Sequence, residues 1–85
     1  MDKTNRAIVY LYIHGKNEKF ELDIPLNITA YELLIGLNEA YHLNMNMTDV
    51  STCFLKTENP IALIRGNRLL SEYGLRNGTI INIVE

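Results

Sequence analysis

The chain is 85 residues long, 47% of its residues are hydrophobic, and its formal net charge is −2 at pH 7. This length allows one domain around one core, and the hydrophobic fraction excludes a disordered chain. The Lys and Arg residues are scattered and do not form the basic stripe of a nucleic-acid binder. No apolar run is long enough to span a membrane, and a single cysteine cannot form an internal disulfide.

Two strand patterns follow a polar segment at residues 1–6, which we expect to be flexible. Residues Ala7 to His14 are apolar or aromatic on both faces, which predicts a central strand. Residues Lys19 to Ile24 alternate between polar and apolar side chains, which predicts a half-buried strand. A polar turn joins the two strands into a β-hairpin, and Pro25 ends it because proline cannot donate to the ladder.

A helix start follows the hairpin. Thr29 and Glu32 have the spacing of a capping box, and Ile28 and Leu33 stand at the two positions of a hydrophobic staple. The helix is expected to end near residues 42–44. Its apolar stripe, which we expect to face the core, consists of Ala30, Leu33, Leu34, Leu37, Ala40 and Tyr41.

Three short strands complete the pattern, at residues 52–56, 61–64 and 79–84. The order is therefore strand, strand, helix, strand, strand, strand. Within one domain this order predicts an α+β fold, in which one helix packs across one face of a mixed sheet of about five strands. The first and last strands are the most apolar, so we expect them side by side at the centre of the sheet, as in a β-grasp arrangement.

Alternation along the strands assigns side chains to the two faces of the sheet. The predicted core consists of Val9, Leu11, Ile13, Phe20, Leu22, Leu33, Leu37, Leu70, Leu75, Ile81 and Ile83. The opposite face then carries an apolar patch formed by Ile8, Tyr10, Tyr12, Ile80 and Val84. Such patches usually contact a partner, and tyrosine is favoured at interfaces. We interpret the patch as a protein-binding surface; the alternatives are that its side chains cover one another or mediate self-association.

Few residues of this sequence could bind a metal ion or act in catalysis. His14 and His42 are the only histidines, and a metal site needs several ligands held together, so we interpret both as solvated surface residues. Cys53 has no evident base beside it and fits a small, partly buried strand position. We therefore predict no enzyme activity, no cofactor and no metal site.

The last third of the chain carries a family resemblance. The block Leu70-Ser71-Glu72-Tyr73-Gly74-Leu75, followed by Arg76-Asn77-Gly78-Thr79, resembles the closing segment of ubiquitin-like folds. In length and order of elements, and most closely from Arg65-Gly66 through Asn77-Gly78, the chain resembles the YukD/EsaB family. These are ubiquitin-like accessory proteins of bacterial type VII (WXG100/ESX-type) secretion. The N-terminal half resembles the family by pattern only.

The resemblance implies a ubiquitin-like β-grasp domain over residues 1–85 that acts as a non-catalytic protein-interaction module. It also implies a cytoplasmic accessory or regulatory component of a membrane-embedded secretion machine, held at the inner face of the membrane only by a protein partner. Conjugated ubiquitin-like modifiers and sulfur carriers act through a terminal Gly-Gly, whereas this sequence reads Ile83-Val84-Glu85. We expect protein partners, no nucleic acid and no direct membrane insertion. The alternatives are a ubiquitin-like adaptor in an unrelated complex and, less favoured, a small carrier or enzyme subunit.

Overall fold

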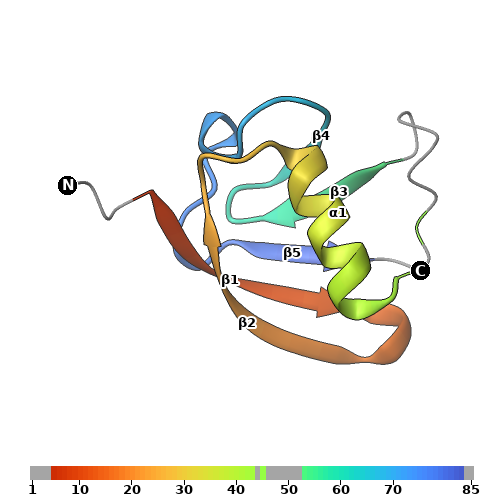
Figure 1. Ribbon diagram of the computed structural model, residues 1–85. Helices are drawn as coiled ribbons and strands as arrows, with labels where there is room; N and C mark the ends of the chain where they lie inside the picture. Colours follow the sequence, from red (N-terminus) through yellow and green to blue (C-terminus); the bar gives the residue numbers. More distant parts are fainter. Residues whose placement is uncertain (1–4, 44, 46–52, 84–85) are drawn as a thin grey trace.

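The computed structural model describes residues 5–43, 45 and 53–83. The predicted order of strands and helix is confirmed (Figure 1). The elements are β1 (Arg6–Ile13), β2 (Glu18–Pro25), α1 (Ala30–Tyr41), β3 (Phe54–Glu58), β4 (Ala62–Arg65) and β5 (Ile80–Ile83), with short 3-10 segments at His14–Lys16 and Leu70–Tyr73.

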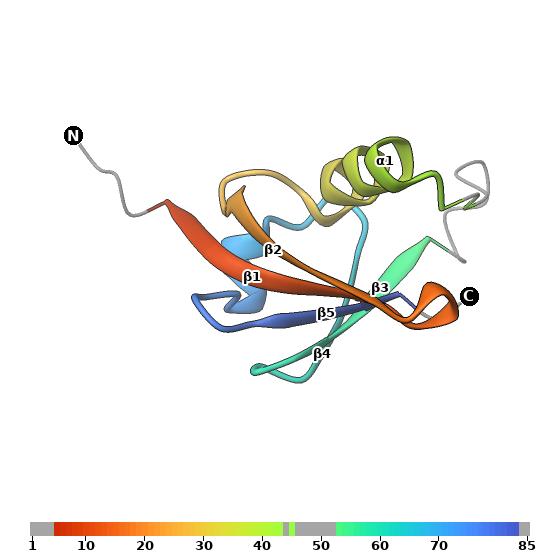
Figure 2. The same cartoon turned by 90° about the horizontal axis from the view of Figure 1, so that it is seen from below.

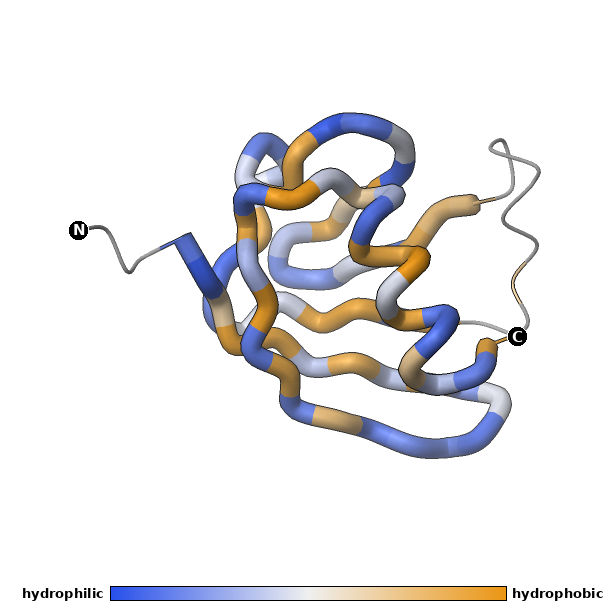
Figure 3. Tube along the Cα trace, viewed as in Figure 1, coloured by the Kyte–Doolittle hydropathy of each residue, from blue (hydrophilic) through white to orange (hydrophobic). Residues whose placement is uncertain are grey.

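The strands form one mixed five-stranded sheet in the order β2-β1-β5-β3-β4. β1 and β5 lie side by side at its centre, as predicted; they run parallel, and the other neighbours are antiparallel. Figures 1 and 2 show α1 crossing one face of the sheet, while no described helix covers the other. In Figure 3 hydrophobic stretches follow the central strands, whereas the turn between β1 and β2 is hydrophilic. This is the β-grasp arrangement that the sequence predicts.

The helix begins at the predicted capping box. The backbone N–H of Glu32 donates to Thr29 Oγ1 at 3.1 Å, and the backbone N–H of Thr29 donates to Glu32 Oε1 at 2.8 Å. These two bonds satisfy N–H groups that the first turn leaves without a helical partner. The helix ends at Tyr41, because His42 adopts the left-handed conformation with a φ of 54°.

The core lies between α1 and the sheet. Nine of the predicted core residues are buried: Val9, Leu11, Ile13, Leu33, Leu37, Leu70, Leu75, Ile81 and Ile83. Phe20 and Leu22 are only half-buried, because β2 is an edge strand, and Phe20 packs on Tyr41 with ring centroids 4.8 Å apart. Ala40 was predicted to face the core but is exposed, while Leu43, just beyond the helix, is buried.

The strand ends differ from the predicted ones by one or two residues. β1 already begins at Arg6, so Arg6 does not belong to a flexible segment. It pairs with Pro25 in the ladder, and its Nε lies 3.0 Å from Asp23 Oδ1. β3 was predicted to end at residue 56 but continues to Glu58, because its ladder with β5 extends that far. Residues 1–4 and 46–52 lie outside the described residues.

Candidate protein-binding surface

The sheet face opposite α1, which we call the outer face, carries the residues that the sequence predicted to bind a partner. Ile8, Tyr10 and Tyr12 alternate along β1 with buried side chains and are half-buried. Ile80 is also half-buried and lies beside Tyr10 on β5. The structure therefore brings these four residues onto one face. Val84, the fifth predicted residue, lies outside the described residues.

Two neighbouring rows of side chains cross the outer face. The Tyr12 row runs over β2, β1, β5, β3 and β4 and consists of Lys19, Tyr12, Asn82, Lys56 and Leu63. The Tyr10 row runs beside it over the first four of these strands and consists of Glu21, Tyr10, Ile80 and Glu58. In both rows a residue of β1, near the start of the chain, lies beside a residue of β5, near its end.

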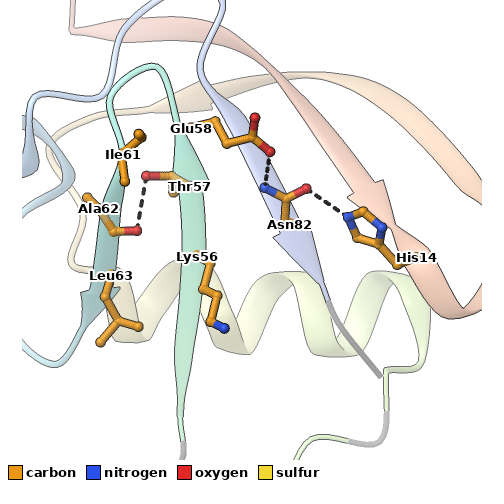
Figure 4. Close-up of a pocket in the computed structure, with 8 residues that line it drawn as sticks. All are labelled: His14, Lys56, Thr57, Glu58, Ile61, Ala62, Leu63 and Asn82. Carbon is orange, nitrogen blue, oxygen red and sulfur yellow. Dashed lines mark hydrogen bonds between the residues drawn. The ribbon is translucent and has the colours of Figure 1, made fainter.

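A chain of polar contacts crosses the middle of the outer face (Figure 4). Asn82 Nδ2 donates to Glu58 Oε2 at 2.9 Å, and Asn82 Oδ1 lies 2.8 Å from His14 Nε2. Because the amide nitrogen of Asn82 donates to the carboxylate, its oxygen is the acceptor, and His14 Nε2 therefore carries the proton. His14 is exposed, as predicted, but its side chain is held in place by this bond.

The two tyrosines of the outer face are each covered in part by a neighbouring side chain. The His14 ring stacks on Tyr12, with centroids 4.5 Å apart and an angle of 20° between the ring planes. Lys19 Nζ lies 5.6 Å from the centroid of the Tyr10 ring, within cation–π range. These contacts explain why both tyrosines are half-buried although no described helix covers them.

Beside this network the outer face is hollowed into an open depression of about 620 Å³ (Figure 4). The side chains around it include those of His14, Asn82, Lys56, Glu58, Ile61 and Leu63. Ile61 is 91% exposed and Leu63 is 42% exposed, the highest exposures of large hydrophobic side chains among the described residues. Lys56 has no ion-pair partner within the described part of the chain. The depression thus combines an uncovered apolar wall with an unpaired cation.

Sequence reasoning did not identify Ile61 and Leu63 as binding residues. The fourth strand pattern is apolar at every position, so alternation could not assign its faces. The burial of Ile64, which turns Leu63 to the other side of the strand, becomes known only from the structure.

The described residues offer no site for metal or nucleophilic chemistry. No group of three or more His, Cys, Asp or Glu side chains among them could hold a metal ion. Cys53 is 1% exposed, and no Ser or Thr side chain in the described ranges is hydrogen-bonded to the side chains of His14, Asn82 or Glu58. In the same part of the chain, α1 is too short to cross a membrane, and no other helix is longer.

The sheet order and the single crossing helix define the class of ubiquitin-like proteins, and comparison with solved structures agrees. The C-terminal ubiquitin-like domain of mouse tubulin-specific chaperone e matches with a TM-score of 0.72 and 13% identity, over 99% of this chain and 90% of that one. The ubiquitin-like domain of Plasmodium falciparum Dsk2 matches with a TM-score of 0.61 and 16% identity, over 91% and 96%. These low identities show the fold alone. No curated protein matches the chain.

The family follows from the sequence itself. The model of the family described as "WXG100 protein secretion system (Wss), protein YukD" matches residues 8–83. The chain therefore belongs to the YukD family of the WXG100 secretion system. The matched range runs from β1 to the end of β5, so it includes the described strands of the outer face. The predicted family and fold are thus confirmed.

Proposed function

We propose that this protein is a non-catalytic interaction module of a WXG100 secretion system. In this proposal it acts in the cytoplasm as an accessory or regulatory component, and it binds a protein partner through its outer face. Membership of the YukD family supports the link to secretion. The observation that carries the binding role is the outer face itself, where half-buried tyrosines on β1 share one face with exposed Ile61 and Leu63.

The chemistry of the outer face suits protein binding. Tyrosine combines an apolar ring with a polar hydroxyl and is enriched among the residues that dominate binding energy. Here both rings already have neighbours, with Tyr12 stacked on His14 and Tyr10 under Lys19. Side chains that are ordered before binding lose less conformational entropy when a partner arrives. Ile61 and Leu63 add apolar area that folding leaves in water.

The experiment is an affinity capture from detergent-solubilised host membranes and cytosol, with the purified protein as bait and mass spectrometry of the bound proteins. Components of the secretion machine should be recovered by the wild-type bait. The variant Tyr12→Ala/Leu63→Ser should lose them, because it removes one aromatic and one apolar contact from the outer face. Ile35→Ser, on the half-buried outer side of α1, is the matched control and should retain them.

Two outcomes would count against the proposal. If the wild-type bait recovers no secretion components, the assignment to the machine fails. If the double variant keeps its circular dichroism spectrum and still recovers the same components at the same affinity, the outer face is not the binding surface.

A further inference from the structure

The outer face has opposite charges in its two rows. On β2 the Tyr12 row carries Lys19 and the Tyr10 row carries Glu21. On β3 the Tyr12 row carries Lys56 and the Tyr10 row carries Glu58. On both strands, therefore, the cation stands in the same row and the anion in the other. All four side chains belong to exposed residues.

We propose that the outer face is an interface between two copies of this chain. The copies would be related by a two-fold axis that lies between the facing sheets, runs perpendicular to the strands, and passes midway between the two rows. This axis places the Tyr12 row of each copy over the Tyr10 row of the other. Lys56 of one copy then faces Glu58 of the second, and Lys19 faces Glu21, and symmetry makes each contact occur twice.

The same operation brings the apolar residues together. Tyr12 of one copy faces Tyr10 of the other on β1. Ile61 and Leu63, which border one depression, face each other from the two copies and lose their exposure to water. Twisted sheets that pack face to face lie about 10 Å apart with their strands at about 30°.

Asn82 does not oppose this burial. It would lie over Ile80 of the second copy, where an amide without hydrogen-bond partners would be costly. Its oxygen and its nitrogen, however, already have partners within the same chain, His14 and Glu58. The polar centre of the face is thus satisfied before association, and Glu58 gains Lys56 as a further partner.

The charge pattern favours a second copy over another occupant. A partner surface that carries charges of only one sign would meet like charges in one of the two rows, on both β2 and β3. A second copy matches both signs on both strands at once. The inference rests on the proposed function only in using the same face, because it requires no secretion component. The two occupants would compete for the outer face.

The test is sedimentation equilibrium of the full chain at low ionic strength, at concentrations up to about 1 mM, where weak association becomes visible. We expect a monomer–dimer equilibrium. Lys56→Glu and Glu58→Lys each place like charges opposite one another twice and should raise the dimer dissociation constant roughly tenfold or more. The double variant Lys56→Glu/Glu58→Lys exchanges the charges of the rows and should restore wild-type association. Mixing the two single variants should give a heterodimer.

Glu58→Lys also removes the hydrogen bond that Glu58 accepts from Asn82, which could weaken association for a different reason. The second charge pair, Lys19 and Glu21, makes no such contact with Asn82 and serves as the control. Lys19→Glu, Glu21→Lys and their double variant should show the same loss and recovery on β2. A wild-type protein that stays monomeric up to the highest concentration overturns the inference. So does a dimer that the single reversals leave unchanged, or a double variant as weak as the single ones. If the protein stays monomeric but its outer-face variants still lose the secretion components in the affinity capture, the dimer is overturned and the proposed function stands.

Discussion

The hydroxyl of Tyr73 bonds both backbone groups of Arg65. The backbone N–H of Arg65 donates to it at 3.1 Å, and the hydroxyl donates to the Arg65 carbonyl at 2.8 Å. Arg65 ends β4, which is an edge strand, so this contact occupies groups that a further strand would otherwise use. Tyr73 thus blocks the end of the β4 edge against pairing with a further strand.

Replacing Tyr73 with Phe should destabilise the protein by about 1–2 kcal/mol, because two hydrogen bonds are lost while the ring remains. The retained ring keeps its contact with the Arg68 guanidinium, which lies 5.3 Å from the ring centroid. Urea unfolding measures the change. Tyr73→Leu, which removes both contacts, is the comparison and should cost more. Equal stability of Tyr73→Phe and wild type would show that water replaces the hydroxyl at no cost.

The helix stripe makes a prediction for Leu37, which is 5% exposed and faces the core from α1. Leu37→Ala should lower the free energy of unfolding by roughly 2–5 kcal/mol, since it removes buried methyl groups and leaves a cavity. Glu39→Ala, at an exposed position of the same helix, should change stability by less than about 0.5 kcal/mol. An unchanged urea midpoint for Leu37→Ala would contradict the packing of α1 on the sheet.

The capping box makes a prediction for the start of α1. Thr29→Ala removes the oxygen that accepts from the Glu32 N–H and should cost about 1 kcal/mol. Thr29→Ser keeps an acceptor at the same place and should remain close to wild type. Thermal unfolding of the three proteins gives the order directly. If the Ser and Ala variants lose the same amount, the methyl group of Thr29 and not its oxygen is responsible.

Two glycines should respond to alanine with opposite signs. Gly74 has a φ of 82°, and an added Cβ there would meet Pro60 Cγ at an ordinary 3.9 Å, so Gly74→Ala costs only the backbone strain, about 1–2 kcal/mol. Gly36 lies in α1 with open space around it, so Gly36→Ala should stabilise the protein by up to about 1 kcal/mol. Chemical denaturation of both variants tests the pair, and a shift in the same direction for both would contradict this account.

Much of the fold was predictable because local signals agreed with it. The continuous apolar run of β1 predicted a central strand, and the spacing of Thr29 and Glu32 predicted where the helix begins. The helix stripe was wrong at Ala40, because a helical wheel does not show where the underlying sheet ends.

The binding surface was predictable only in part. Alternation along β1 and β5 placed Tyr10, Tyr12 and Ile80 on one face. The contacts of His14 with Asn82, and of Asn82 with Glu58, join the 3-10 segment after β1 to β5 and β3, and they depend on ladder registers that this sequence pattern alone does not give. The exposed residues near β4 were missed because an all-apolar strand pattern has no alternation from which to read its faces.

Neighbouring residues of β4 should separate binding from folding. Ile64 is fully buried, so Ile64→Ala should cost roughly 2–5 kcal/mol of stability. Leu63 is 42% exposed and points to the outer face, so Leu63→Ser should cost less than about 1 kcal/mol. In the proposed dimer the second copy covers Leu63, which folding leaves partly in water. Urea unfolding tests the stabilities, and sedimentation equilibrium tests whether Leu63→Ser weakens self-association. A large loss of stability in Leu63→Ser would show instead that Leu63 serves the fold.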